Sequence, residues 1–274
     1  MAPEPGYELL DAGDGRRLER FGGVVVDRPA PGAEAVRRAG VAEWRAADLR
    51  FDRGTGWTGV APEEWTVEID DVRLGLRPTA TGQVGLFPEH QLLWPWLIDC
   101  VRGRPGVEIL SLFAYTGATT LALAQAGARV THVDGSSPAV AWARSNASLS
   151  GLTDRPIRWI LDEALAFTRR EARRGRRYGG IVLDPPSYGH GPDGRRWRFR
   201  DALPELLEAL AAIADASAFV ALTTHTSGQE GADLHQGLRD AFGLEVAIET
   251  TELDLAARSG AVLRLGSAAR MIRR

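Results

Sequence analysis

The sequence predicts an α/β protein in which a small β-rich N-terminal domain precedes a larger domain built on a mostly parallel sheet. Residues 1–88 are rich in Gly, Pro and Trp, with short strand-like runs between turns. From Pro88 onward, apolar strand-like runs alternate with helix-like segments, which is typical of parallel βαβ units. The 274 residues suffice to bury a substantial core. We therefore expect two domains, residues 1–88 and 89–274.

The N-terminal part shows several short strand patterns. Residues 23–26 form one of them, and residues 65–69 and 72–76 are expected to pair as a hairpin across Asp70-Asp71. A helix over residues 88–101 joins the two domains, and we expect Pro95 to kink it.

The larger domain is expected to contain seven strands with helices between them. The strands are predicted at residues 107–112, 129–133, 157–161, 181–183, 218–223, 244–250 and 261–265. The helices are predicted at residues 117–126, 138–149, 163–173, 202–214 and 234–241. Because the last two strands follow each other closely, we expect the final strand to run antiparallel.

Composition excludes several classes of site. The chain has no lysine, so its 33 basic residues are all arginine, which excludes a Schiff-base lysine, a pyridoxal-phosphate anchor and a P-loop lysine. Cys100 is the single cysteine, which excludes internal disulfides and cysteine-rich zinc sites. We expect Cys100 to be a packing residue, and we expect no metal site. A net charge of −3 argues against a uniformly basic nucleic-acid binder but allows a local basic strip.

Neither a secretion signal nor a membrane span is expected. The first ten residues lack a basic stretch followed by an apolar run, and no segment reaches about 18 consecutive apolar residues. A cytoplasmic protein with no membrane partner is therefore the expectation.

The loop after the first strand of the larger domain is a candidate cofactor site. Ligands of open α/β sheets lie beyond the carboxyl ends of the strands, where the strand order reverses. The residues there are Phe113, Ala114, Tyr115, Thr116 and Gly117. They lack the G-x-G-x-x-G pattern that cradles the pyrophosphate of a dinucleotide.

Acidic residues follow the next two strands. Asp134, followed by Gly135 and Ser136, could accept both ribose hydroxyls, and Asp162 could accept the exocyclic amine of an adenine. Glu163 and Ala164 follow Asp162 in the same loop. The alternative is that both aspartates are helix N-caps. Together they describe a nucleoside pocket without a diphosphate cradle, which suits S-adenosylmethionine better than NAD.

The fourth strand ends in a turn with candidate catalytic residues. Its sequence is Asp184-Pro185-Pro186-Ser187-Tyr188. The two prolines stiffen the loop, so that Asp184 and a proline carbonyl could accept hydrogen bonds from an exocyclic amine. Tyr188 could stack on a flat base, with Pro186 and Ser187 beside it. The alternative is a rigid turn that only ends the strand.

These motifs resemble a known family. LFAYTG (residues 112–117), VDGS (133–136), ARSNASLSGL (143–152) and LDPPSY (183–188) are similar to segments of the bacterial 23S rRNA large-subunit methyltransferases and their relatives. The resemblance covers roughly residues 65–274, including GQVGLFPEHQ at 82–91. It implies a class I S-adenosylmethionine-dependent enzyme with a Rossmann-like seven-stranded methyltransferase sheet. It also implies a methyl donor in a crevice lined by residues 113–117, Asp134, Asp162 and Asp184, with Phe87 and His90 covering it.

One departure from the family bears on the acceptor atom. Family members that methylate C5 of cytosine share a nucleophilic cysteine after the fifth strand. This chain has His225 at the corresponding position. C5 methylation requires such a thiolate, so the sequence argues against a 5-methylcytosine enzyme. The remaining possibility is direct transfer of the methyl group to a nitrogen or oxygen atom of the substrate. His225 could contact the substrate and accept its proton, or it could simply be packed.

Two arginine-rich runs suggest contacts outside the pocket. Residues 169–177 end a helix, where cations complement the helix dipole, and a solvated surface is expected there. Residues 195–200 follow the Asp-Pro-Pro turn on a flexible loop. Arg195 and Trp197 there, together with His190, could bind single-stranded RNA through phosphates and base stacking.

The predicted function is methyl transfer from S-adenosylmethionine to a nitrogen of an RNA base, with rRNA as the candidate partner. Two alternatives remain open: a small-molecule or protein methyltransferase on the same fold, and a catalytically silent cofactor-binding protein.

Overall fold

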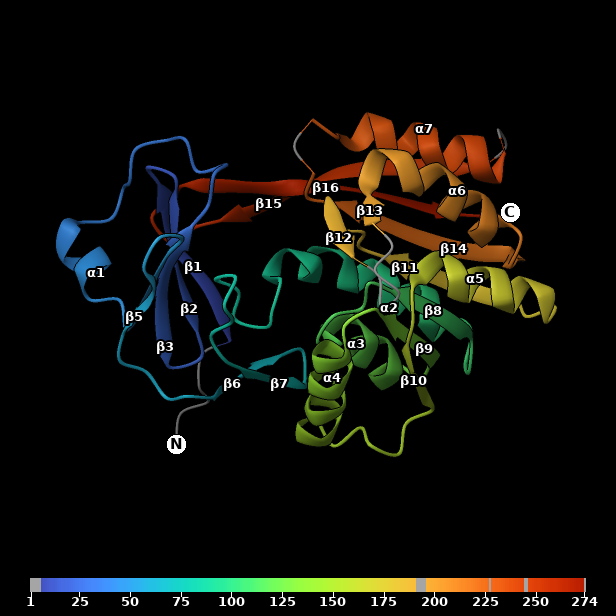
Figure 1. Ribbon diagram of the computed structural model, residues 1–274, viewed down its shortest axis with the longest axis horizontal. Coiled ribbons are helices and arrows are strands. Elements are labelled where there is room, and N and C mark those ends of the chain that lie inside the picture. Colours follow the sequence, from blue (N-terminus) through green and yellow to red (C-terminus); the bar gives the residue numbers. More distant parts are fainter. Residues whose placement is uncertain (1–5, 191–195, 227, 244–245, 274) are drawn as a thin grey trace. The chain divides into compact units, whose positions relative to one another are not determined.

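The computed structural model describes residues 6–190, 196–226, 228–243 and 246–273. The chain divides into two compact units (Figure 1). The first contains residues 1–90 and also takes up residues 254–265, and the second contains residues 91–253 and 266–274. Among the described residues, no helix combines the length and apolar character that crossing a membrane requires.

The first unit contains a five-stranded sheet in the order β1-β2-β3-β4-β5. Its strands are β1 (Tyr7–Gly13), β2 (Arg16–Phe21), β3 (Val24–Pro29), β4 (Leu49–Asp52) and β5 (Gly56–Gly59). A short helix, α1 (Val41–Arg45), precedes β4 in sequence. Strands β3 and β4 pair in parallel, and the other neighbouring pairs are antiparallel.

A separate hairpin, β6 (Trp65–Ile69) and β7 (Val72–Leu76), confirms the predicted pairing. Its two turn residues, Asp70 and Asp71, both have left-handed backbone, with φ of 47° and 64°. A type I′ turn needs positive φ at both central positions, and Asp tolerates this better than most residues.

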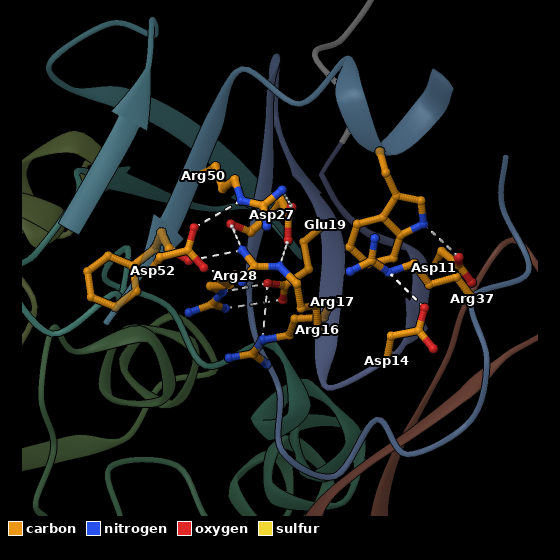
Figure 2. Close-up of polar contacts among 12 residues, drawn as sticks. Asp11, Asp14, Arg16, Arg17, Glu19, Asp27, Arg28, Arg37, Arg50 and Asp52 are labelled. Atoms are coloured by element: carbon orange, nitrogen blue, oxygen red, sulfur yellow. Dashed lines mark hydrogen bonds and ion pairs between the residues drawn. The ribbon is translucent and has the colours of Figure 1, made fainter. Parts of the chain in front are cut away.

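Ion pairs lie buried on β2 and β3 (Figure 2). Glu19 is fully buried, and the Arg28 guanidinium donates to both of its carboxylate oxygens, at 2.5 and 3.1 Å. Arg17 Nε lies 3.3 Å from the same carboxylate. Arg16 Nε donates to Asp27 at 2.6 Å. Burial by itself would raise the pKa of Glu19, but the two adjacent guanidinium groups outweigh it and hold that pKa below its usual value.

Asp11 contributes to the attachment of residues 254–265 to the first unit. Its buried carboxylate accepts hydrogen bonds from the Arg38 and Ala39 amides at 3.0 and 2.8 Å, and from the Trp44 indole at 3.0 Å. The hydroxyl of Ser259 donates to the other oxygen at 2.6 Å. One carboxylate therefore joins β1 to two loops that are distant in sequence.

The second unit contains a seven-stranded sheet in the order β10-β9-β8-β11-β14-β16-β15, except for the parts of β15 and β16 within residues 254–265, which belong to the first unit. Its strands are β8 (Glu108–Leu112), β9 (Arg129–Asp134), β10 (Ile157–Leu161), β11 (Tyr178–Leu183), β14 (Ala214–Thr224), β15 (Ala247–Ala256) and β16 (Val262–Ile272). The first five in sheet order are parallel, and β16 is antiparallel to β14. The predicted α/β sheet with an antiparallel final strand is confirmed.

Helices pack in two groups in this unit (Figure 1). They are α2 (Trp94–Arg102), α3 (Ala118–Gln125) and α4 (Ser137–Leu149) in one group, and α5 (Ala164–Arg173), α6 (Phe199–Ala211) and α7 (Gly231–Phe242) in the other. The apolar core between the second group and the sheet is built from β8, β11 and β14 together with these helices. Burial of these apolar faces positions the loops at the strand ends.

Two local predictions need correction. The expected kinked helix over residues 88–101 is instead a 3-10 turn, η1 (Pro88–Leu93), followed by α2. Pro95 lies in the first turn of α2, where a missing backbone N–H breaks no helical hydrogen bond, so it does not act as a kink. The final strand pairs with β14 through residues 267–272, beyond the predicted range of 261–265.

Candidate active site

Adjacent loops at the carboxyl edge of the second unit's sheet carry most of the predicted site residues. Strands β8, β9, β10 and β11 end level with one another, because Leu112 pairs with Val133 and Leu183, and Leu161 pairs with Asp134. The strand order reverses between β8 and β11, which is the ligand-binding position of open α/β sheets.

The loop after β8 adopts an uncommon backbone. Phe113, Tyr115 and Gly117 all have positive φ, at 53°, 50° and 86°. This conformation is costly for the two aromatic residues, and backbone of this kind clusters at active sites and ligand-binding loops. A Cβ atom on Gly117 would lie 3.0 Å from the Cβ of Ala143 in α4, so glycine is needed there both for φ and for space.

Asn146 forms a hydrogen bond to this loop. The sequence analysis did not identify it as a site residue. It is fully buried in α4, and its Nδ2 donates to the Thr116 carbonyl at 2.9 Å. Beneath the loop, Thr120 Oγ1 lies 3.0 Å from Nδ1 of the buried His132. Burial, aided by the Arg144 charge, lowers the pKa of His132 to about 3, so this histidine is neutral at physiological pH. The one sequence signal was that Asn146 is the only asparagine in the chain.

Asp134 ends β9 beside the same loop. Its Oδ2 accepts from the Tyr115 amide and its Oδ1 from the Ser136 amide, both at 2.8 Å. Burial raises the pKa of Asp134, and these two amide bonds oppose that rise. Ser136, whose hydroxyl accepts from the Ala139 amide, is the N-cap of α4, so Asp134 is not the capping residue. Each carboxylate oxygen has a second lone pair with which it can accept from a ribose hydroxyl.

Asp162 and Glu163 follow β10 and have different roles. Glu163 is the N-cap of α5, and its carboxylate accepts from the Leu165 and Ala166 amides at 2.9 and 2.7 Å. Asp162 accepts from the Glu163 amide at 2.8 Å and forms an ion pair with Arg170. The capping that we considered for Asp162 is therefore supplied by its neighbour, and Ala164 is the buried first residue of α5.

Asp184 lies between two side chains from the end of β14. The hydroxyl of Thr223 donates to Oδ1 of Asp184 at 2.5 Å, and Nε2 of His225 lies 3.2 Å from the same oxygen. Both Asp184 and His225 are partly exposed, at 21% and 27% of their side-chain surface. The histidine that replaces the expected cysteine is thus in direct contact with the aspartate of the turn.

Trp197 has a different role from the one predicted. It is 8% exposed, its indole donates to the Pro186 carbonyl at 2.6 Å, and its ring centroid lies 5.0 Å from that of Phe113. Phe199, two residues on, is buried in the core. Both aromatic side chains are buried, Trp197 against the Asp-Pro-Pro turn and Phe199 at the start of α6, so they are not placed to stack on bases.

The segment after the turn is a hairpin. Strands β12 (Tyr188–His190) and β13 (Arg196–Arg198) pair antiparallel, which corrects the flexible loop expected at His190. Arg195 lies outside the described residues. Ser187 Oγ accepts from the Thr226 hydroxyl at 2.8 Å, and Tyr188 is 52% exposed. A half-exposed tyrosine next to the turn can present its ring to a base.

The sequence singled out three other residues. Cys100 is half-buried on α2, ahead of β8 in the chain, and burial raises the pKa of its thiol. Phe87 and His90 belong to the first unit, where their rings lie 5.9 Å apart.

One of the solved structures that this chain resembles matches it over its whole length. The S-adenosylmethionine-dependent methyltransferase from Agrobacterium tumefaciens is 34% identical, with a TM-score of 0.93 over 100% of this chain and 92% of that one. A second methyltransferase, solved with S-adenosylhomocysteine, has a TM-score of 0.80 over 99% of this chain and 76% of its own. At 16% identity it shows the fold alone.

Among curated proteins, the ribosomal RNA large subunit methyltransferase K/L of Ectopseudomonas mendocina is 33% identical over 157 residues. The match covers 55% of this chain and 21% of that protein, so this chain spans about a fifth of its length. No family model matches the chain. Full-length similarity to the Agrobacterium tumefaciens enzyme, together with the loop geometry, shows that the chain belongs to the class I S-adenosylmethionine-dependent methyltransferases.

Proposed function

We propose that this enzyme transfers a methyl group from S-adenosylmethionine to a nitrogen atom of an RNA base, with large-subunit rRNA as the substrate. The main support for this proposal is the position of the Asp184 carboxylate. Thr223 and His225 orient it at the edge of the sheet where ligands bind. The name of the Ectopseudomonas mendocina relative supports the choice of RNA.

The turn after β11 suits an amine on a flat ring. Trp197 fixes the Pro186 carbonyl, which leaves the Asp184 carboxylate and the Pro185 carbonyl as candidate acceptors for an exocyclic amine. Tyr188 is exposed enough to stack on the base. A rigid turn with two acceptors and one stacking ring holds a base in a single orientation.

Nitrogen is favoured over a pyrimidine carbon by the position of the only thiol. Carbon methylation at C5 needs a thiolate that adds to the ring. Cys100 lies on α2, and burial raises the pKa of its thiol, whereas His225 lies beside Asp184. These features support exclusion of a cysteine-dependent 5-methylcytosine mechanism.

The cofactor loops fit the methyl donor. Asp134 offers both carboxylate oxygens to ribose hydroxyls, and the glycine at 117 allows a close approach of the loop to α4. When bound, S-adenosylmethionine supplies an electrophilic methyl group on its sulfonium sulfur. The Asp184 carboxylate and the Pro185 carbonyl would orient the acceptor amine toward that methyl group. The Asp184–His225 pair would accept the proton that the amine loses on methylation.

The Asp134→Ala substitution is expected to weaken binding of S-adenosylmethionine by about a hundredfold, because two hydrogen bonds to a charged acceptor are lost. Affinity of the parent enzyme should also fall as the pH is lowered, since the raised pKa of Asp134 allows earlier protonation. Isothermal titration calorimetry measures both effects. The exposed Asp154→Ala variant is the control, and an unchanged affinity in Asp134→Ala would remove this residue from the cofactor site.

The choice of substrate class is tested by incubating the purified enzyme with methyl-labelled S-adenosylmethionine and protein-free rRNA. We expect label in the RNA, and none after nuclease digestion of the substrate. Label that instead persists on protein or small molecules in a nuclease-treated extract would contradict an RNA substrate.

A further inference from the structure

A group of exposed arginines gathers at the opposite edge of the sheet from the active site. We call Arg158, Arg173, Arg174, Arg176 and Arg177 the arginine surface. Arg158 lies in β10, whereas the other four lie at the end of α5 and in the segment before β11. These residues therefore come from two parts of the chain and meet through folding.

One buried carboxylate joins the two parts. Oε1 of Glu171 pairs with Arg174 Nη1 at 3.0 Å, and its Oε2 lies 3.6 Å from Arg158 Nη1. The hydroxyl of Tyr178 also donates to Oε2, at 2.7 Å. Glu171 is 1% exposed, whereas Arg158 and Arg174 are 45% and 61% exposed. The guanidinium groups thus lie over the buried carboxylate and face solvent.

The helix dipole accounts for only part of the positive charge on the arginine surface. The sequence led us to expect a solvated helix end, and the dipole of α5 accounts for Arg173 in its last turn. It does not account for Arg158, which is in a strand, or for Arg176 and Arg177, which follow the helix. Among the residues that the structure describes, Glu171 is the carboxylate that pairs with the set, in a chain whose net charge is −3. Positive charge is therefore concentrated here on an otherwise acidic protein.

The arginine surface is remote from the transferred methyl group. Helix α5 starts beside Asp162 at the carboxyl edge and ends at the amino edge, where β11 begins at Tyr178. Strand β11 has six residues, and a rise of about 3.3 Å per residue separates the two edges by roughly 20 Å. A single bound nucleotide cannot contact both edges.

We propose that the arginine surface binds the phosphate backbone of the RNA substrate at a distance from the target base. The inference rests on the proposed RNA substrate. Guanidinium groups bind phosphate oxygens in pairs through their planar fork, and several of them together favour a polyanion over an isolated charge. Such contacts position the RNA and contribute affinity without reading its sequence.

The test neutralises the three arginines that do not pair with Glu171, in the triple variant Arg173→Gln, Arg176→Gln, Arg177→Gln. The control triple variant, Arg45→Gln, Arg53→Gln, Arg239→Gln, removes the same charge from exposed positions elsewhere. Binding of a fluorescein-labelled stem-loop RNA is followed by anisotropy over a series of salt concentrations. Calorimetry with S-adenosylmethionine reports separately on the active site.

The salt slope of RNA binding is expected to fall by about two to three units in the arginine-surface variant, with binding of S-adenosylmethionine unchanged. The control variant should keep the parent slope. Equal slopes in all three proteins, or an equal loss in the control, would overturn the proposal, as would salt-insensitive binding of the parent. The anisotropy assay involves no methyl transfer, so RNA that binds through these arginines but is not methylated would contradict the proposed function alone.

Discussion

Replacing Asp184 by alanine is expected to lower kcat for methyl transfer by at least about a hundredfold, the usual contribution of a positioned acid or base group. In the proposed mechanism the carboxylate orients the acceptor amine and, with His225 beside it, accepts the released proton. The variant also leaves the Thr223 hydroxyl without the acceptor at 2.5 Å that it has in the parent. Rates measured with labelled S-adenosylmethionine and rRNA give kcat and KM separately.

The Asp184→Asn variant sharpens this prediction. Asparagine keeps the shape of the side chain but removes its charge, so a loss of kcat similar to that of alanine would assign the effect to the carboxylate. The exposed Asp240→Asn variant on α7 is the control and should retain parent activity. Full activity in both Asp184 variants would show that the turn is only structural.

Replacing Glu19 by alanine is expected to destabilise the protein by about 3–5 kcal/mol, because it leaves buried guanidinium groups without their counter-charge. Arg28 would lose both hydrogen bonds to the carboxylate, and Arg17 would lose its neighbouring anion. Figure 2 shows how closely these three side chains lie on β2 and β3. Hydrogen exchange of the β2 and β3 amides in the full chain measures the loss within the unit concerned.

The control for this prediction is Glu8→Ala. Glu8 is 42% exposed and lies 3.6 Å from Arg20, and a pair of this kind contributes up to about 1 kcal/mol. The pKa of Glu19 is lowered in the folded protein, so the ionised carboxylate stabilises the fold at neutral pH. This contribution to the free energy of unfolding is lost in acid, below about pH 4. Equal exchange rates in the two variants would contradict a stabilising role for the buried pair.

Sequence patterns placed the helices and strands of the second unit closely because apolar periodicity reports burial directly. The helix predicted at 138–149 is α4 (Ser137–Leu149), and its Ser136 cap is readable from the sequence. The first unit was harder to predict. Strand β2 contains buried Arg16, Arg17 and Glu19, and charged residues in a strand pattern normally indicate a solvent-facing side. Their burial depends on partners from other strands, which periodicity does not reveal.

In the candidate site, too, some residues could be predicted from the sequence and others could not. Asp134 and Asp184 could be located because residues after parallel strands meet at one edge of the sheet. The side chains that support them could not: Asn146 contacts Thr116 from 30 positions away, and Trp197 contacts the Pro186 carbonyl from 11. The alternating arginine and aromatic residues of 195–200 indicated RNA contact, but Trp197 and Phe199 are buried and Arg198 faces solvent.

The identity of the methylated nucleoside tests the central claim most directly. Nucleosides from rRNA of a strain that lacks the gene are compared by mass spectrometry with those of the parent strain. We expect one N-methylated nucleoside to be missing, restored by the intact gene and not by the Asp184→Ala variant. Loss of 5-methylcytosine, or a profile identical to that of the parent, would contradict nitrogen methylation of rRNA by this enzyme.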